Sequence, residues 1–167
     1  MPKTSRVALV TGATRGIGFN IGKEIVKRMA LTKTYMTSRA DVEGFSAMLG
    51  MELGAMARRR SKFVKLDIRD VKQVYELKDK IVKNFGGLDI LVNNAGIYHQ
   101  ADKNPSIFSK QVRDILGTNY WGTKNVISAF SPHFKPHSRI VNITSNLGHI
   151  LSVKCLEEDV RENLRMR

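Results

Sequence analysis

Three glycines near the N-terminus have the spacing of a phosphate-binding turn. The segment Thr11–Gly18 is Thr-Gly-Ala-Thr-Arg-Gly-Ile-Gly. Gly12 can adopt a positive φ, while Gly16 and Gly18 allow a ligand to approach the backbone without a Cβ in the way. The segment follows the apolar run Val7–Val10 and opens a helical pattern, so free N–H groups at a helix N-terminus would face a phosphate. A Gly-x-x-x-Gly-x-Gly turn between a strand and a helix predicts a dinucleotide site, although ordinary glycine turns share this spacing.

Two arginines lie where the adenosine ribose of such a cofactor would bind. The second predicted strand ends at Ser38 and Arg39, about twenty residues beyond the turn, where an NAD site usually has Asp or Glu. Arg15 lies inside the turn itself. Guanidinium groups bind phosphate through a planar fork, so this pair favours the 2′-phosphate of NADPH over NADH. The alternatives are two exposed surface arginines, or a role for the nearby acid Asp41 in binding NADH.

Polar residues also follow the third and fourth predicted strands. Asp67, next to Ile68, can accept a hydrogen bond from an adenine amino group or can cap the following helix. Asn93, Asn94 and Gly96 come directly after an apolar strand. Open α/β sheets bind ligands at the carboxyl ends of their strands, so all these residues are candidates for the cofactor site.

Short apolar runs alternate with longer helical patterns, which predicts βαβ units and one α/β domain with a Rossmann-type, doubly wound parallel sheet. We expect this domain to span residues 1–151 and a polar insertion or tail to begin at 152–167. Pro132 and Pro136 are expected to bracket a loop. Strands are predicted at Val7–Val10, Thr34–Thr37, Phe63–Leu66, Ile90–Val92 and Ile140–Ile143. Helices are predicted at Ile17–Met29, Val42–Ala57, Val71–Phe85 and Ile107–Phe130.

Composition excludes several other classes of protein. The 167 residues include a single cysteine, Cys155, which excludes a disulfide framework and favours a cytoplasmic location. No apolar stretch approaches ~18 residues, so no membrane span is expected. The formal net charge is +13, with a dense cluster at Arg58–Lys62. No nucleic-acid-binding motif accompanies that cluster, which we interpret as a solvated helix end, and we expect no bound metal.

The ordered motifs resemble those of the short-chain dehydrogenases/reductases, most closely the branch of NADPH-dependent carbonyl reductases. The resemblance covers residues 6 to about 148. It implies hydride transfer from NADPH to the carbonyl group of a small ketone, aldehyde or quinone. By position, Ser145 would hold the substrate oxygen and Asn119 would be the helix asparagine of the family. The motifs that carry the resemblance are Thr11-Gly12-x-x-x-Gly16-x-Gly18, Asp67, Asn93-Asn94-Ala95-Gly96, Asn119 and Ser145.

The Tyr-x-x-x-Lys pair of the family is not found after Ser145. Tyr120 and Lys124 fit the string, but they share a helix with Asn119 and precede the serine strand. We therefore reject them and expect Tyr120 to be a core or interface aromatic. Two interpretations remain. In the favoured one the sequence is a fragment whose catalytic tyrosine, lysine and C-terminal part lie further on; in the other it is a non-catalytic dinucleotide-binding module.

The resemblance also implies a monomer at full length. The predicted catalytic residues are Ser145 and Asn119. The predicted cofactor-binding residues are Gly12, Thr14, Arg15, Gly16, Ile17, Gly18, Arg39, Asp67, Ile68, Asn93, Asn94 and Gly96.

Overall fold

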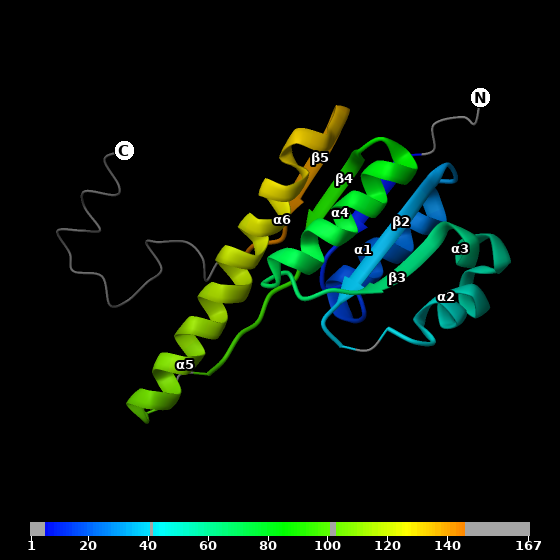
Figure 1. Ribbon diagram of the computed structural model, residues 1–167. Coiled ribbons are helices and arrows are strands. Elements are labelled where there is room, and N and C mark those ends of the chain that lie inside the picture. The colour runs from blue at the N-terminus through cyan, green and yellow to red at the C-terminus, as the bar shows by residue number, and fades with distance from the viewer. Residues whose placement is uncertain (1–5, 41, 101–102, 146–167) are drawn as a thin grey trace, which may run out of the picture.

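Five parallel strands form one sheet in the computed structural model, which describes residues 6–40, 42–100 and 103–145 (Figure 1). The strand order is β3-β2-β1-β4-β5, so the chain starts at the centre and winds outward in both directions, as predicted. The predicted tail at 152–167, with Cys155, and the alternative acid Asp41 lie outside the described residues. The strands are β1 (Arg6–Val10), β2 (Thr32–Ser38), β3 (Ser61–Lys65), β4 (Leu88–Asn93) and β5 (Phe134–Asn142).

Helices cover both faces of this sheet (Figure 1). None of them, among the residues that the structure describes, is long and apolar enough to cross a membrane. A π-helical segment, Leu116–Gly122, joins α5 to α6 in one rod. The helices are α1 (Gly16–Arg28), α2 (Phe45–Leu53), α3 (Ala55–Arg60), α4 (Val71–Phe85), α5 (Pro105–Ile115) and α6 (Thr123–Phe130), and the short 3-10 helix Ser131–His133 precedes β5.

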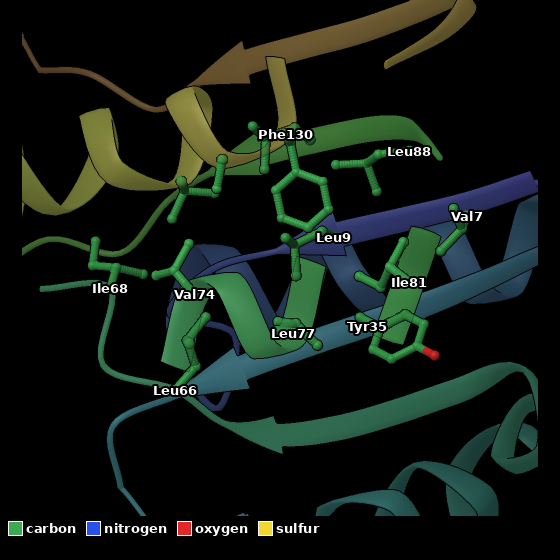
Figure 2. Close-up of a cluster of buried hydrophobic side chains, with 13 residues drawn as sticks. Val7, Leu9, Tyr35, Leu66, Ile68, Val74, Leu77, Ile81, Leu88 and Phe130 are labelled. Carbon is green, nitrogen blue, oxygen red and sulfur yellow. The ribbon is translucent and has the colours of Figure 1, made fainter. Parts of the chain in front are cut away.

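The central strand β1 sends alternate side chains into two separate cores. Leu9 packs with Leu77 of α4 and Phe130 of α6 on one face, as Figure 2 shows. Val10 packs with Val26 of α1 on the other face. All of these side chains are almost fully buried, and burial of each contributes about 1.5–3 kcal/mol. A strand that is buried on both faces has an almost continuous run of apolar residues, and for this reason the sequence predicted β1.

Local signals fix the ends of α4. The side chain of Asp70 accepts a hydrogen bond from the N–H of Gln73 at 3.2 Å, which caps the N-terminus. Gly86 ends the helix with φ 75°, and the observed bounds Val71–Phe85 are those predicted from the sequence. The N–H of Asp67 also donates to Oε1 of Gln73 at 3.1 Å, which holds the segment after β3 against the first turn of α4.

Three predicted elements differ from the structure. The helix expected at Val42–Ala57 is two helices, because Gly54 with φ 87° breaks the α-helix between α2 and α3. The helix expected at Ile107–Phe130 contains the π-helical segment. The loop expected between Pro132 and Pro136 is wrong, since β5 begins at Phe134 and contains Pro136; proline is tolerated in a strand at the edge of a sheet.

Candidate cofactor site

The glycine turn joins β1 to α1 at the carboxyl edge of the sheet. Gly12 has φ 63° and Gly16 has φ 56°, a region of backbone conformation that other residues rarely adopt. A Cβ on Gly12 would lie only 2.7 Å from the Cα of Ala95, whereas a Cβ on Gly16 would meet nothing within 4 Å. Gly12 thus allows the glycine turn to approach the loop after β4, and Gly16 leaves open space at the N-terminus of α1.

Thr11 and Asn94 hold the turn against the loop that follows β4. The amide Nδ2 of Asn94 donates to the carbonyl oxygens of Thr11 and Gly12, each at 2.9 Å. The hydroxyl oxygen of Thr11 accepts from the backbone N–H groups of Asn94 and Ala95, each at 3.0 Å. These four bonds fix the spacing between the two loops that form the cofactor crevice.

A cavity of about 560 Å³ opens between these loops, within the range of about 300–1,000 Å³ typical of ligand sites. Its walls come from segments at the carboxyl ends of β1 to β4, together with one residue of the π-helical segment. Most of the predicted cofactor residues line it. The lining residues are Gly12, Thr14, Arg15, Gly16, Ile17, Ser38, Arg39, Ala40, Leu66, Ile68, Asn94, Ala95, Gly96, Ile97 and Thr118.

Arg15 and Arg39 both line this cavity and both are exposed. The hydroxyl of Thr14 donates to the Ser38 hydroxyl at 3.0 Å, and Ser38 in turn accepts from the N–H of Ala40 at 3.2 Å. The glycine turn and the end of β2 are thereby linked, and each contributes one arginine to the lining of the cavity. Guanidinium groups bind phosphate through charge-assisted hydrogen bonds, so these two side chains are candidates for a phosphate site.

Asp67 is not among the residues that line the cavity. Its carboxylate forms a forked ion pair with Arg69, whose Nη2 lies 2.8 Å from Oδ2 and whose Nε lies 3.1 Å from both oxygens. This hydrogen bonding holds the pKa of Asp67 below its usual value, and the charges of Arg69 and Arg39 lower it further. The alternative that Asp67 caps α4 is wrong, because Asp70 is the cap; a bond from Asp67 to an adenine amino group stays a prediction.

Gly18 and Asn93 lie behind the cavity wall rather than in it. A Cβ on Gly18 would overlap the amide nitrogen of Asn94, so this glycine is required by the packing of α1 against the Asn94 side chain. Asn93 is 5% exposed, and its Nδ2 donates to Oδ1 of Asn142 on β5 at 2.9 Å. Both residues support the site without lining it.

Asn119 joins the π-helical segment to the loop after β4. Its Oδ1 accepts from the N–H of Ile97 at 2.8 Å, and its Nδ2 donates to the carbonyl oxygen of Ile97 at 2.9 Å. Ser145 lies three residues beyond the end of β5 and is exposed. The strand pairing places it on the same edge as the cavity, because Asn142 pairs with Asn93 and the N–H of Ile143 donates to the Asn93 carbonyl at 2.9 Å.

Tyr120 is exposed, so the expectation that it fills the core is wrong. Its ring lies edge-on to Trp121, with 4.9 Å between centroids, and the Lys124 ammonium lies over the Trp121 ring at 5.1 Å. Lys124 is thus engaged with the indole. An interface role for Tyr120 stays a prediction.

Sequence reasoning missed six residues that line the cavity. Leu66 and Ile97 flank predicted residues and could have been found from their position after strands, whereas Thr118 precedes Asn119 in a helix and carries no such signal. The remaining three are Ser38, Ala40 and Ala95.

Comparison with known proteins agrees with this geometry. The sequence profile of the short chain dehydrogenase family matches residues 6–155. Carbonyl reductase (NADPH) 3 of Mus musculus is 38% identical over 165 residues, which cover 99% of this chain and 57% of that protein. Carbonyl reductase (NADPH) 1 of Sus scrofa is 39% identical over 148 residues, which cover 89% of this chain and 50% of that protein. The chain therefore spans about half the length of the curated relatives that it matches.

Solved structures share the fold. The menthone neomenthol reductase of Mentha piperita superposes with a TM-score of 0.75 at 28% identity, covering 97% of this chain and 72% of that one. A structure of ElxO with NADP bound superposes with a TM-score of 0.67 at 30% identity, covering 84% of this chain and 56% of that one.

Proposed function

Because the chain belongs to the short chain dehydrogenase family, we propose that it binds NADPH and serves an oxidoreductase that reduces carbonyl groups to alcohols. The observation that carries the proposal is that Arg15 and Arg39 both line a cavity that the residues of the glycine turn also line. NADPH appears in the names of the similar carbonyl reductases, and NADP is bound in the related ElxO structure.

The residues present fit this cofactor. Gly16 offers backbone without a Cβ next to the N-terminus of α1, whose N–H groups and dipole favour a pyrophosphate. Arg15 and Arg39 suit a 2′-phosphate, and the apolar side chains of Leu66 and Ile68 suit the adenine ring. When bound, NADPH supplies the hydride that reduces the carbonyl carbon.

We assign two further roles within this proposal. Ser145 donates a hydrogen bond to the substrate carbonyl oxygen, where negative charge develops during reduction. Asn119 acts as a positioning residue, because its two bonds to Ile97 fix the loop beside the cavity. We propose that Tyr120 is not the proton donor; its ring is exposed and lies against Trp121. The substrate class is small ketones, aldehydes or quinones.

Charge reversal tests the cofactor assignment. We expect the chain to bind NADPH at least about tenfold more tightly than NADH, because two guanidinium groups contact the additional phosphate. Replacing both residues, Arg15→Glu and Arg39→Glu, should abolish or reverse that preference. Arg58→Glu with Arg59→Glu, on exposed α3, is the matched control for net charge and should keep the preference. Equal affinities that the first pair of substitutions leaves unchanged would refute the assignment.

A turnover assay tests the assignment of the proton donor. The purified 167-residue chain is expected to show no carbonyl reduction with NADPH. A normal rate from this chain, lost in Tyr120→Phe, would show that the rejection of Tyr120 was wrong.

A further inference from the structure

Thr118 is the residue of the π-helical segment that lines the cofactor cavity. Its side chain is 2% exposed, whereas the next two residues, Asn119 and Tyr120, are exposed. The segment therefore turns Thr118 inward, between the loops that follow β3 and β4.

The hydroxyl of Thr118 has no hydrogen-bond partner among the described residues, and solvent does not reach it. A threonine within a helix ordinarily bonds the carbonyl three or four residues earlier. A buried hydroxyl without a partner is destabilising. Of the five described side chains that have a buried polar atom without a partner, Thr118 is the one that lines the cavity. The sequence thus retains a polar atom beside the cavity at a cost to the free energy of folding.

The surroundings of Thr118 suit a flat heteroaromatic ring. Leu66 and Ile68, which follow β3, and Ala95 to Ile97, which follow β4, line the same cavity as Thr118. Ile68 is fixed in place because it packs directly on Gly122, where a Cβ would lie 2.6 Å from its Cγ1. Apolar walls fit the faces of a purine, but its edge carries ring nitrogens and an amino group that need polar partners.

The position of the arginines orients such a ring. If the proposed function holds, Arg15 and Arg39 bind the 2′-phosphate, and the base attached to the same ribose extends toward the loop after β3. That loop carries Leu66 and Ile68, which line the same cavity as Thr118, so a base bound there lies within reach of the Thr118 side chain.

We propose that the Thr118 hydroxyl is a hydrogen-bonding partner of the adenine ring in this cavity. A helical threonine has two accessible χ1 rotamers, so the hydroxyl can turn toward the cavity when the base enters. It can donate to a ring nitrogen or accept from the amino group. This contact is distinct from the predicted bond between Asp67 and the adenine amino group, because the Asp67 carboxylate lies outside the cavity and is paired with Arg69.

Two substitutions of Thr118 separate recognition from packing. Thr118→Val keeps the shape and removes the hydroxyl, while Thr118→Ser keeps the hydroxyl and removes the methyl group. The probe is adenosine 2′,5′-bisphosphate, which carries the base and the 2′-phosphate but no nicotinamide. Its dissociation constant is measured by calorimetry for each form, and the unfolding midpoint of each ligand-free form is measured in urea.

The proposal predicts opposite effects for the valine variant. Its affinity for the probe should fall about fivefold or more, while its midpoint in the absence of ligand stays equal or rises, since an unpaired buried hydroxyl has been removed. The serine variant should bind within about twofold of the original chain, because a hydroxyl alone is sufficient for the bond. Unchanged affinity for the probe in the valine variant would overturn the proposal. Equal losses of affinity in both variants, together with lower unfolding midpoints, would also overturn it, because that result shows that Thr118 acts through packing. No binding of the probe by the original chain would instead reject the proposed cofactor site, and this inference with it.

Discussion

Gly18→Ala should disrupt the cofactor site from behind. The new Cβ would overlap the Asn94 amide nitrogen and would lie 2.7 Å from the carbonyl oxygen of Gly12. Asn94 would have to move, and its two hydrogen bonds to the glycine turn would be lost. The helix N-terminus and the loop after β4 would then separate.

The size of this effect follows from the contacts. Two hydrogen bonds contribute about 1 kcal/mol each, and leaving partly buried polar groups without partners costs about 1–3 kcal/mol. Alanine gains about 1 kcal/mol over glycine inside a helix. The expected net loss is about 2–4 kcal/mol, which reduces but does not exceed the ordinary stability of a domain, about 5–15 kcal/mol.

Urea unfolding measures this loss, with Gly117→Ala as the control. A Cβ on Gly117 would contact only Cδ of Arg69, at 3.7 Å, so that variant should be as stable as the original chain or slightly more so. Gly18→Ala should lower the midpoint by about 1 M or more and weaken NADPH binding. In a chain that also carries Asn94→Ala, the loss of stability caused by Gly18→Ala should be smaller by at least about 1 kcal/mol. The overlap with the Asn94 side chain is then absent, and only the overlap with the Gly12 carbonyl oxygen remains. A Gly18→Ala chain with the original midpoint and affinity would refute the account of how the turn is held.

Two further substitutions test the hydrogen bonds around the site. Thr11→Val leaves two backbone N–H groups after β4 without their acceptor, so it should lower the free energy of unfolding in urea by about 2 kcal/mol. Thr11→Ser keeps the hydroxyl and should lower it by less than about 1 kcal/mol. Equal losses in the two variants would show that the hydroxyl does not stabilise this loop. Hydrogen bonds from Arg69 lower the pKa of Asp67 in the folded chain. The ion pair therefore stabilises the fold at pH values above the usual aspartate pKa of about 3.9. This stabilisation is lost as the pH falls through the lowered pKa that Asp67 has in the folded chain. Arg69→Gln should therefore be less stable than the original chain at pH 7 and show a smaller deficit at pH 2–3; a deficit independent of pH would contradict this sign.

Patterns in the single sequence predicted much of the fold. The parallel sheet was predictable because β1 is buried on both faces and reads as an apolar run, and the turn because its glycines adopt positive φ or pack without a Cβ. The prediction was wrong where one residue decides locally. Gly54 breaks an otherwise helical pattern between α2 and α3, and β5 contains Pro136, because an edge strand tolerates a missing N–H.

The sequence predicted the site residues whose type is required by the backbone geometry. It predicted less well the hydrogen-bond and ion-pair partners of side chains that have several possible partners. Asp67 pairs with Arg69 two residues away, a choice that spacing does not reveal. Thr118 lines the cavity from a π-helical segment, and the sequence pattern predicted an uninterrupted helix there. The roles of Ser145 and of the two arginines, the domain boundary, the monomeric state and the cytoplasmic location stay predictions.

The most direct test of the central claim is a calorimetric titration of this chain with adenosine 2′,5′-bisphosphate and with adenosine 5′-monophosphate. The two ligands share the base, ribose and 5′-phosphate and differ in the 2′-phosphate alone, so the comparison isolates the contribution proposed for Arg15 and Arg39, which both line the cavity. We expect the bisphosphate to bind at least about tenfold more tightly, by more than ~1.4 kcal/mol, and added salt to reduce this difference. Equal affinities, or tighter binding of the monophosphate, would contradict the assignment of this cavity to NADPH.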